Sequence, residues 1–259
     1  MQTVVSTDGT RIAYETHGDG PPLILLHGGG TRRYWDPVIP YFDDDYMVVV
    51  PDRRGRGESG DRDEYSLGRE VEDVCAVIDA VAEEPILFGH SFGGLRALEA
   101  ARRKSVSAVI AYEPAVLVGD YREQADLVAR MQERLDAGDR RGAMRLHLRE
   151  VLHGDISDDA FEQWLAEWPA WPDYTRFVES TLRMNRVIEA YDLPDTIDID
   201  APVLLLTGSD GPSHLRDSIR AVDTAVPESQ LVEFENLGHN GPVIDPEHVS
   251  TAVQEFLQK

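Results

Sequence analysis

Short apolar runs, each followed by turn-forming residues, recur on either side of a central segment of the chain. Between the runs lie helical patterns such as Val71, Val74, Ile78 and Val81, whose spacing puts their side chains on one helix face. Continuous apolar strands separated by helices are typical of a parallel sheet covered on both faces. The runs are LILL (23–26), MVVV (47–50), ILF (86–88), AVIAY (108–112), VLLL (203–206) and QLVEF (230–234). They predict an α/β fold with a mostly parallel, doubly wound sheet.

The central segment, 118–197, contains none of these strand-like runs. Amphipathic helical patterns fill it, and no glycine- or serine-rich linker separates it from its neighbours. An all-helical insertion between two strands of one sheet is best interpreted as a cap over the edge of that sheet. We therefore expect one α/β core formed by residues 1–117 and 198–259, with the helical cap at 118–197.

The balance of charged residues limits the possible partners. Acidic residues number 48 and basic residues 25, a formal net charge of −23. Such a surface repels polyanions, which argues against nucleic acids and anionic membranes as partners. Two explanations of the charge remain open: a solubilising surface, or adaptation to high salt, where counterions screen the self-repulsion.

The cysteine count and the hydropathy of the N-terminus bear on the compartment. Cys75 is the single cysteine, which excludes an internal disulfide and fits a reducing compartment. The sequence has neither a signal-peptide pattern nor an apolar run of membrane-spanning length. We expect a cytoplasmic protein that does not associate with membranes.

The stretch ILFGHSFGG places Ser91 between glycines, with a predicted strand before it and a predicted helix after it. This is the G-x-S-x-G pattern, in which a sharp strand-to-helix turn exposes a serine nucleophile. The alternative is a serine that only caps the helix, since serine is a common N-cap. The flanking glycines and the additional Gly94 favour the nucleophile.

A serine nucleophile needs a base and an oxyanion hole, and the chain offers both at strand ends. His239 follows the last predicted strand, where a base can take the serine proton and return it to the leaving group. The backbone N–H of Phe92, next to the serine, is the first candidate oxyanion donor. The second is Gly29 in the LLHGGG loop after the first buried strand.

The order of LLHGGG, VVVPDRRGRGESG, LFGHSFGG, a helical segment, VLLLTGSD and NLGHN spans nearly the whole chain and resembles the α/β-hydrolase fold superfamily. Within it, the chain is most similar to the serine-nucleophile branch of esterases and lactonases with a helical cap. The resemblance implies a catalytic triad, with Ser91 as nucleophile and His239 as base.

The acid of the triad has two candidates. Most members of the superfamily place it after the strand that corresponds to VLLLTG, usually as G-x-x-D, but here Asp210 comes one residue early in Gly208-Ser209-Asp210. Some members, lactone-cleaving ones included, use an acid after the preceding strand, which is the place of Glu113 in AYEP. Both stay open, and the residues around Glu113 slightly favour it.

No pattern calls for a metal or a cofactor. The histidines and the cysteine match neither H-E-x-x-H nor a zinc-binding spacing. The G-x-G-x-x-G at 55–60 follows a strand, but a loop and not a helix follows it, so no helix N-terminus is there to bind a pyrophosphate.

In the predicted cap, Trp164 and Trp168 recur at helical spacing and Trp171 follows closely. Such a stripe often only packs, yet a cap covers the mouth above Ser91, so we expect these rings to line the substrate pocket. The sequence thus predicts a serine hydrolase (a carboxylesterase or lactonase) acting on an apolar small molecule. The alternatives are carbon–carbon bond hydrolysis or cofactor-free, haloperoxidase-like perhydrolysis on the same triad, and, from another class, a ligand-binding receptor.

Overall fold

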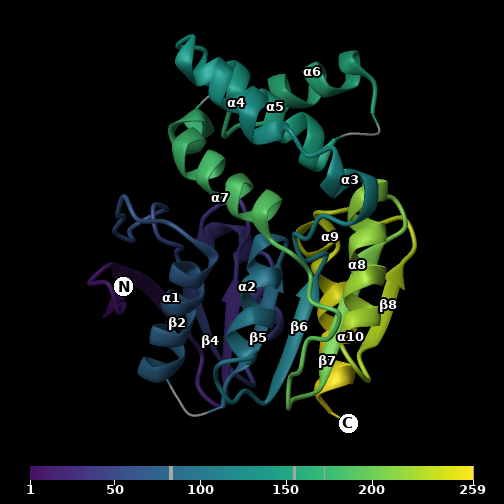
Figure 1. Cartoon of the computed structure of the whole chain (residues 1–259). Coiled ribbons are helices and arrows are strands. Elements are labelled where there is room, and N and C mark those ends of the chain that lie inside the picture. Colours follow the sequence, from purple (N-terminus) through teal and green to yellow (C-terminus); the bar gives the residue numbers. More distant parts are fainter. Residues whose placement is uncertain (82–83, 154–155, 172, 259) are drawn as a thin grey trace.

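An eight-stranded sheet runs through the protein (Figure 1), whose structure is a computed structural model that describes residues 1–81, 84–153, 156–171 and 173–258. The strands are β1 (Gln2–Val5), β2 (Arg11–His17), β3 (Pro22–Leu26), β4 (Met47–Pro51), β5 (Ile86–His90), β6 (Ala108–Tyr112), β7 (Val203–Gly208) and β8 (Gln230–Phe234). Their order is β1-β2-β4-β3-β5-β6-β7-β8, antiparallel up to β4 and parallel from there to β8. The predicted mostly parallel α/β sheet is confirmed.

Helices cover both faces of the sheet because alternate strand side chains point to opposite sides. On β3, Ile24 and Leu26 pack with residues of α1, α2 and α8, whereas Leu23 and Leu25 pack with residues of α10 and of the 3-10 turns after β3. These helices are α1 (Leu67–Val81), α2 (Phe92–Ala101), α8 (Ser213–Ala225) and α10 (Pro246–Leu257), and the turns are η1 (Arg32–Trp35) and η2 (Ile39–Tyr41). Among the described residues, no helix is both long and apolar enough to cross a bilayer.

The strand order reverses direction at β3, and this places the candidate site. From β3 the chain crosses to β4 on one side and then to β5 on the other, so β3 pairs in parallel with both. The carboxyl ends of β3 and β5 lie side by side, with Leu26 opposite Gly89. Open α/β sheets bind ligands at such a switch point, because the loops that leave the two strands diverge there.

The segment between β6 and β7 forms a separate layer above the carboxyl ends of the strands (Figure 1). Its helices are α3 (Gly119–Glu123), α4 (Leu127–Asp136), α5 (Arg140–Leu152), α6 (Asp158–Glu167), η3 (Asp173–Phe177) and α7 (Val178–Ala190), called here the cap helices. They share an apolar cluster of their own that includes Met131, Met144, Leu148 and Phe161. The cap helices are therefore held together by their own packing and not by the sheet alone.

Candidate functional site

Ser91 lies at the turn from β5 into α2, in a backbone conformation that residues other than glycine rarely adopt. Its φ is 56° and its ψ is −124°, and although it occupies the N-cap position its side chain makes no capping hydrogen bond. A non-glycine residue at positive φ is uncommon and costs energy that the surrounding structure must offset. The hydroxyl is thus held away from the helix backbone, and Ser91 lines a cavity instead.

The glycines around Ser91 are required by close backbone contacts. A Cβ on Gly93 would lie 1.9 Å from the Leu26 carbonyl oxygen, and one on Gly89 would lie 2.3 Å from the Gly93 carbonyl oxygen. A Cβ on Gly28 would lie 2.8 Å from Ser91 Cβ. Only glycine fits at these distances, so the serine turn and the glycine loop after β3 pack against each other.

His239 and Glu113 form a hydrogen-bonded pair beside this turn. His239 Nδ1 lies 2.7 Å from Glu113 Oε2, and Glu113 also accepts from Thr207 Oγ1 at 2.8 Å and from the Gly208 N–H at 3.3 Å. Glu113 is fully buried. Burial by itself raises the pKa of Glu113, but the bond and charge of His239, with the other two donors, bring that pKa below its ordinary value. The carboxylate is therefore kept ionised next to the imidazole.

Asp210, the other candidate acid, lies apart from His239. It is exposed, and its carboxylate accepts from Ser209 Oγ at 2.8 Å. Within the described part of the chain, no hydrogen bond or ion pair joins the Asp210 and His239 side chains. Glu113 Oε2 already occupies the hydrogen-bonding position at His239 Nδ1.

Two backbone N–H groups near Ser91 are available to a ligand. In the described residues, neither the Phe92 N–H nor the Gly29 N–H has a protein acceptor. The Gly29 carbonyl accepts from the Tyr174 hydroxyl at 2.7 Å, so a residue of the cap helices holds the glycine loop. This arrangement has the donors that an oxyanion requires.

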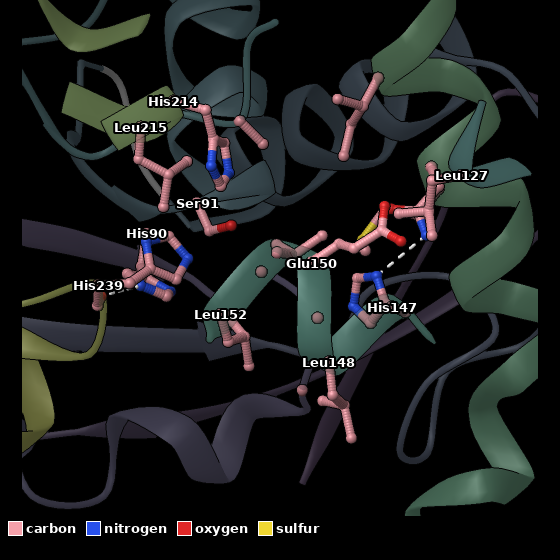
Figure 2. Close-up of a pocket in the computed structure, with 18 of the residues that line it drawn as sticks. His90, Ser91, Leu127, His147, Leu148, Glu150, Leu152, His214, Leu215 and His239 are labelled. Atoms are coloured by element: carbon pink, nitrogen blue, oxygen red, sulfur yellow. Dashed lines mark hydrogen bonds between the residues drawn. The ribbon is translucent and has the colours of Figure 1, made fainter. Parts of the chain in front are cut away.

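The rings of His90 and His239 lie 4.5 Å apart between centroids, and the His239 carbonyl accepts from His90 Nε2 at 2.7 Å. Chiefly burial, and then the nearby His239, lower the pKa of His90 well below its ordinary value, so His90 is neutral. Within the described structure no hydrogen bond joins Ser91 Oγ to His239, although both residues line the same cavity (Figure 2). Such bonds often tighten only when substrate is bound.

The cavity over Ser91 has a volume of about 1440 Å³ and lies between the sheet and the cap helices. Trp164 and Trp168 line it. The sequence predicts that Trp171, which follows Trp168 closely, lines the cavity as well, but it is not among the described lining residues. Its ring packs 5.2 Å from the Arg141 guanidinium on α5. Tyr174 and His147 line the cavity as well. No local sequence pattern singles out these two residues, since their positions depend on how the cap helices pack on the core.

The glycine-rich stretch 55–60 is a turn, and the two buried arginines directly before it bind carboxylates of α1. Arg53 Nε donates to Glu70 Oε1 at 3.1 Å, and Arg54 binds Asp73 through Nε and Nη2 at 2.6 and 2.7 Å. The helix α1 begins only at Leu67. No group of three or more side chains that could hold a metal ion occurs among the residues that the structure describes.

Comparison with known proteins identifies the family. A model described as the alpha/beta hydrolase family matches residues 23–252. The chain is 27% identical to a candidate non-heme bromoperoxidase (BpoC) of Mycobacterium tuberculosis, over 95% of this chain and 97% of that protein. It is also 27% identical to the pimeloyl-[acyl-carrier protein] methyl ester esterase of Aeromonas hydrophila, over 95% and 99%. A solved alpha/beta hydrolase of Sphaerobacter thermophilus is 31% identical with a TM-score of 0.85, over 98% and 99% of the two chains.

Proposed function

The chain belongs to the alpha/beta hydrolase family, and on that basis we propose that it is a serine hydrolase that cleaves a carboxylic ester or lactone of an apolar small molecule. The observation that carries the proposal is the buried Glu113–His239 pair, with its 2.7 Å hydrogen bond, beside Ser91 in its strained turn at the cavity wall. A carboxylate that holds an imidazole next to a serine is the arrangement that activates a serine nucleophile.

In the proposed reaction, Ser91 Oγ attacks the substrate carbonyl while His239 Nε2 takes the hydroxyl proton. The Phe92 and Gly29 N–H groups donate to the resulting oxyanion. His239 then gives its proton to the departing alkoxide, which leaves an acyl group on Ser91. A water molecule, deprotonated by His239, attacks this acyl group, and the proton returns to Ser91 as the carboxylic acid is released. Glu113 accepts from the His239 Nδ1–H throughout and stabilises the imidazolium.

The preference for an apolar substrate follows from the cavity wall. Trp164 and Trp168 face the cavity with Tyr174 and Phe177, and the rings of Trp164 and Trp168 stack with centroids 5.1 Å apart. Aromatic side chains in a cavity wall favour apolar ligands. The net charge of −23 disfavours polyanionic substrates.

The test is hydrolysis of p-nitrophenyl esters and labelling by a fluorophosphonate, compared between the wild type and Ser91→Ala. Both signals should fall to background in Ser91→Ala, because no other group supplies the nucleophile. Ser105→Ala, which changes an exposed serine, should leave both unchanged. Turnover or labelling that persists in pure Ser91→Ala would refute the proposal.

A second candidate is perhydrolysis, favoured by the similarity to the candidate bromoperoxidase. Here hydrogen peroxide replaces water in attacking the acyl group and releases a peracid, which oxidises bromide. Bromination of monochlorodimedone in the presence of acetate, peroxide and bromide, lost in Ser91→Ala, would support this second activity. Ester hydrolysis without bromination would exclude it.

A further inference from the structure

We propose that His147 of α5 binds the substrate through its Nε2–H, and that the substrate therefore carries a second oxygen acceptor besides the carbonyl that Ser91 attacks. This inference rests on the proposed function, because it concerns the same cavity. His147 is a buried polar side chain, 4% exposed, that lines the cavity. Figure 2 shows it on α5, among the residues that line the cavity with Ser91.

The hydrogen bonding of the ring decides which nitrogen carries the proton. Asn185 Nδ2 lies 3.0 Å from His147 Nδ1 and also donates to Met131 Sδ at 3.3 Å. An amide NH₂ group suits both neighbours, whereas an amide oxygen in its place would face the sulfur without a donor. His147 Nδ1 is therefore the acceptor, and a neutral ring must carry its proton on Nε2.

The ring is neutral because of its surroundings. Burial, and next the positive charge of Arg56, lower the pKa of His147 to about 3. Arg56 is itself buried, donates to Thr181 Oγ1 at 2.7 Å and lies 4.6 Å from the centre of the Phe177 ring. No carboxylate pairs with Arg56 among the described residues. Arg56 is therefore a buried cation near His147 without a paired carboxylate in the described residues, which favours an electron-rich oxygen over a hydrogen-bond donor.

The position of Nε2 places this donor within the reach of a bound substrate. It lies 4.0 Å from the place that a Cβ on Gly29 would occupy, so the imidazole faces the proposed oxyanion loop. Nε2 has no hydrogen-bond partner in the described part of the chain. Glu150, one turn later on α5, also faces the cavity, but its carboxylate is engaged by Arg130. His147 thus offers an unengaged donor on this wall.

The test compares substrates that differ only in an oxygen atom replacing a CH₂ group. On the acyl side the pair is p-nitrophenyl methoxyacetate and p-nitrophenyl butyrate, and on the alcohol side it is 2-methoxyethyl butyrate and butyl butyrate. For each pair the ratio of kcat/KM, corrected by the rates of alkaline hydrolysis, measures the preference for oxygen. His147→Phe should lower this ratio about tenfold in one pair or both, the effect of one lost hydrogen bond.

Three further variants separate binding from structure. His147→Leu repeats the deletion in case the phenyl ring disturbs packing, and His147→Gln, whose side-chain NH₂ can donate from a similar place, should keep the ratio within about threefold. His153→Leu is the matched control, because His153 is another histidine among the cap helices that packs against Trp164 but is not among the described cavity-lining residues. It should leave the ratio unchanged.

An unchanged ratio in both substrate pairs for the folded His147 variants would overturn the assignment. An equal fall of the ratio in His153→Leu would overturn it too, since the effect would then come from cap packing. Absence of Ser91-dependent ester cleavage in the wild type is a different result. It would refute the proposed function, and this assignment with it.

Discussion

Two residues of the site, Ser91 and Glu113, both have positive φ, 56° and 41°. Each such conformation costs about 1–3 kcal/mol in a residue with a side chain. Backbone bonds hold both in place, since the Ser91 N–H donates to the Tyr112 carbonyl and the Glu113 N–H donates to the Leu206 carbonyl, each at 2.9 Å. The sheet therefore fixes the serine turn and the carboxylate together.

Replacement of either candidate acid by its amide tests which one completes the triad. Glu113→Gln should lower kcat for p-nitrophenyl esters by roughly 10³- to 10⁴-fold, because the amide no longer stabilises the imidazolium of His239. Asp210→Asn should change kcat by less than about threefold, since Asp210 is exposed and bonded to Ser209. A large loss in Asp210→Asn with little loss in Glu113→Gln would reverse the assignment.

At the scale of residues, the sequence predicts those site residues that belong to a local pattern. Ser91 follows from a short motif, and His239 follows from its place after the last strand. The choice between Glu113 and Asp210 does not follow, because it depends on which carboxylate points inward. Glu113 accepts bonds from β7 and from His239, contacts that join segments far apart in the chain.

At the scale of elements, the cap helices and the core meet at a hydrogen bond that holds the proposed oxyanion loop. Tyr174 in η3 donates to the Gly29 carbonyl at 2.7 Å. The adjoining Gly29 N–H is one of the two proposed oxyanion donors, so the position of the cap helices and the geometry of the oxyanion hole are connected. We expect the connection to appear in catalysis more than in stability.

Tyr174→Phe removes only the hydroxyl that makes this contact. It should lower kcat/KM for esters about three- to tenfold, the effect of one hydrogen bond, with little change in the free energy of unfolding. Tyr191→Phe is the matched control, because the Tyr191 hydroxyl donates to Glu99 Oε1 at 2.8 Å and is not among the described cavity-lining groups. Unchanged kinetics in Tyr174→Phe, or equal losses in both variants, would contradict the connection.

The elements of the core could be predicted because buried strands are continuous apolar runs with turn residues after them. The contacts between the cap helices and the core could not. Trp171 shows why: it follows Trp168 closely in the sequence, but Trp168 is the C-cap of α6, so Trp171 lies beyond the helix, and the Arg141 guanidinium lies over its ring. A helical period predicts a shared face only while the helix continues.

At the scale of the whole molecule, three of the buried histidines should make stability sensitive to acid. The pKa values of His27, His90 and His147 are all lowered, chiefly by burial. In the unfolded chain the histidine pKa is about 6.5, so below that pH the unfolded state binds protons that the folded state does not. Folding is therefore most favoured above about pH 6.5, and each histidine removes up to about 1.4 kcal/mol per pH unit as the pH falls further.

Urea unfolding between pH 7.5 and about pH 5 measures this slope. His27→Gln should be less stable at pH 7.5 but should show a shallower loss on acidification, because one of the three groups is gone. His248→Gln, which changes an exposed histidine on α10, should keep the slope of the wild type. Identical slopes in the wild type and His27→Gln would show that this histidine does not contribute.

The net charge of −23 gives a second expectation for the whole molecule. If the acidic surface is an adaptation to high salt, the thermal unfolding midpoint should rise from dilute buffer to multimolar KCl, because counterions screen the repulsion among carboxylates. Sorbitol at equal osmolality is the control, since it supplies no counterions. A midpoint that does not depend on KCl would leave the charge as a solubilising surface only.

The cap helices enter the chain between β6 and β7, two strands that are neighbours in the sheet and pair in parallel. The chain leaves and re-enters the core at a single junction, so a different insertion there leaves every other strand pair as it is. In evolutionary terms, the layer that we propose to select the substrate can diverge, provided that a contact such as Tyr174 to Gly29 is kept, while the layer that performs the proposed chemistry is inherited. Changes in the inserted segment can therefore alter the substrate preference of a descendant protein without changing Ser91 or the strands that hold it.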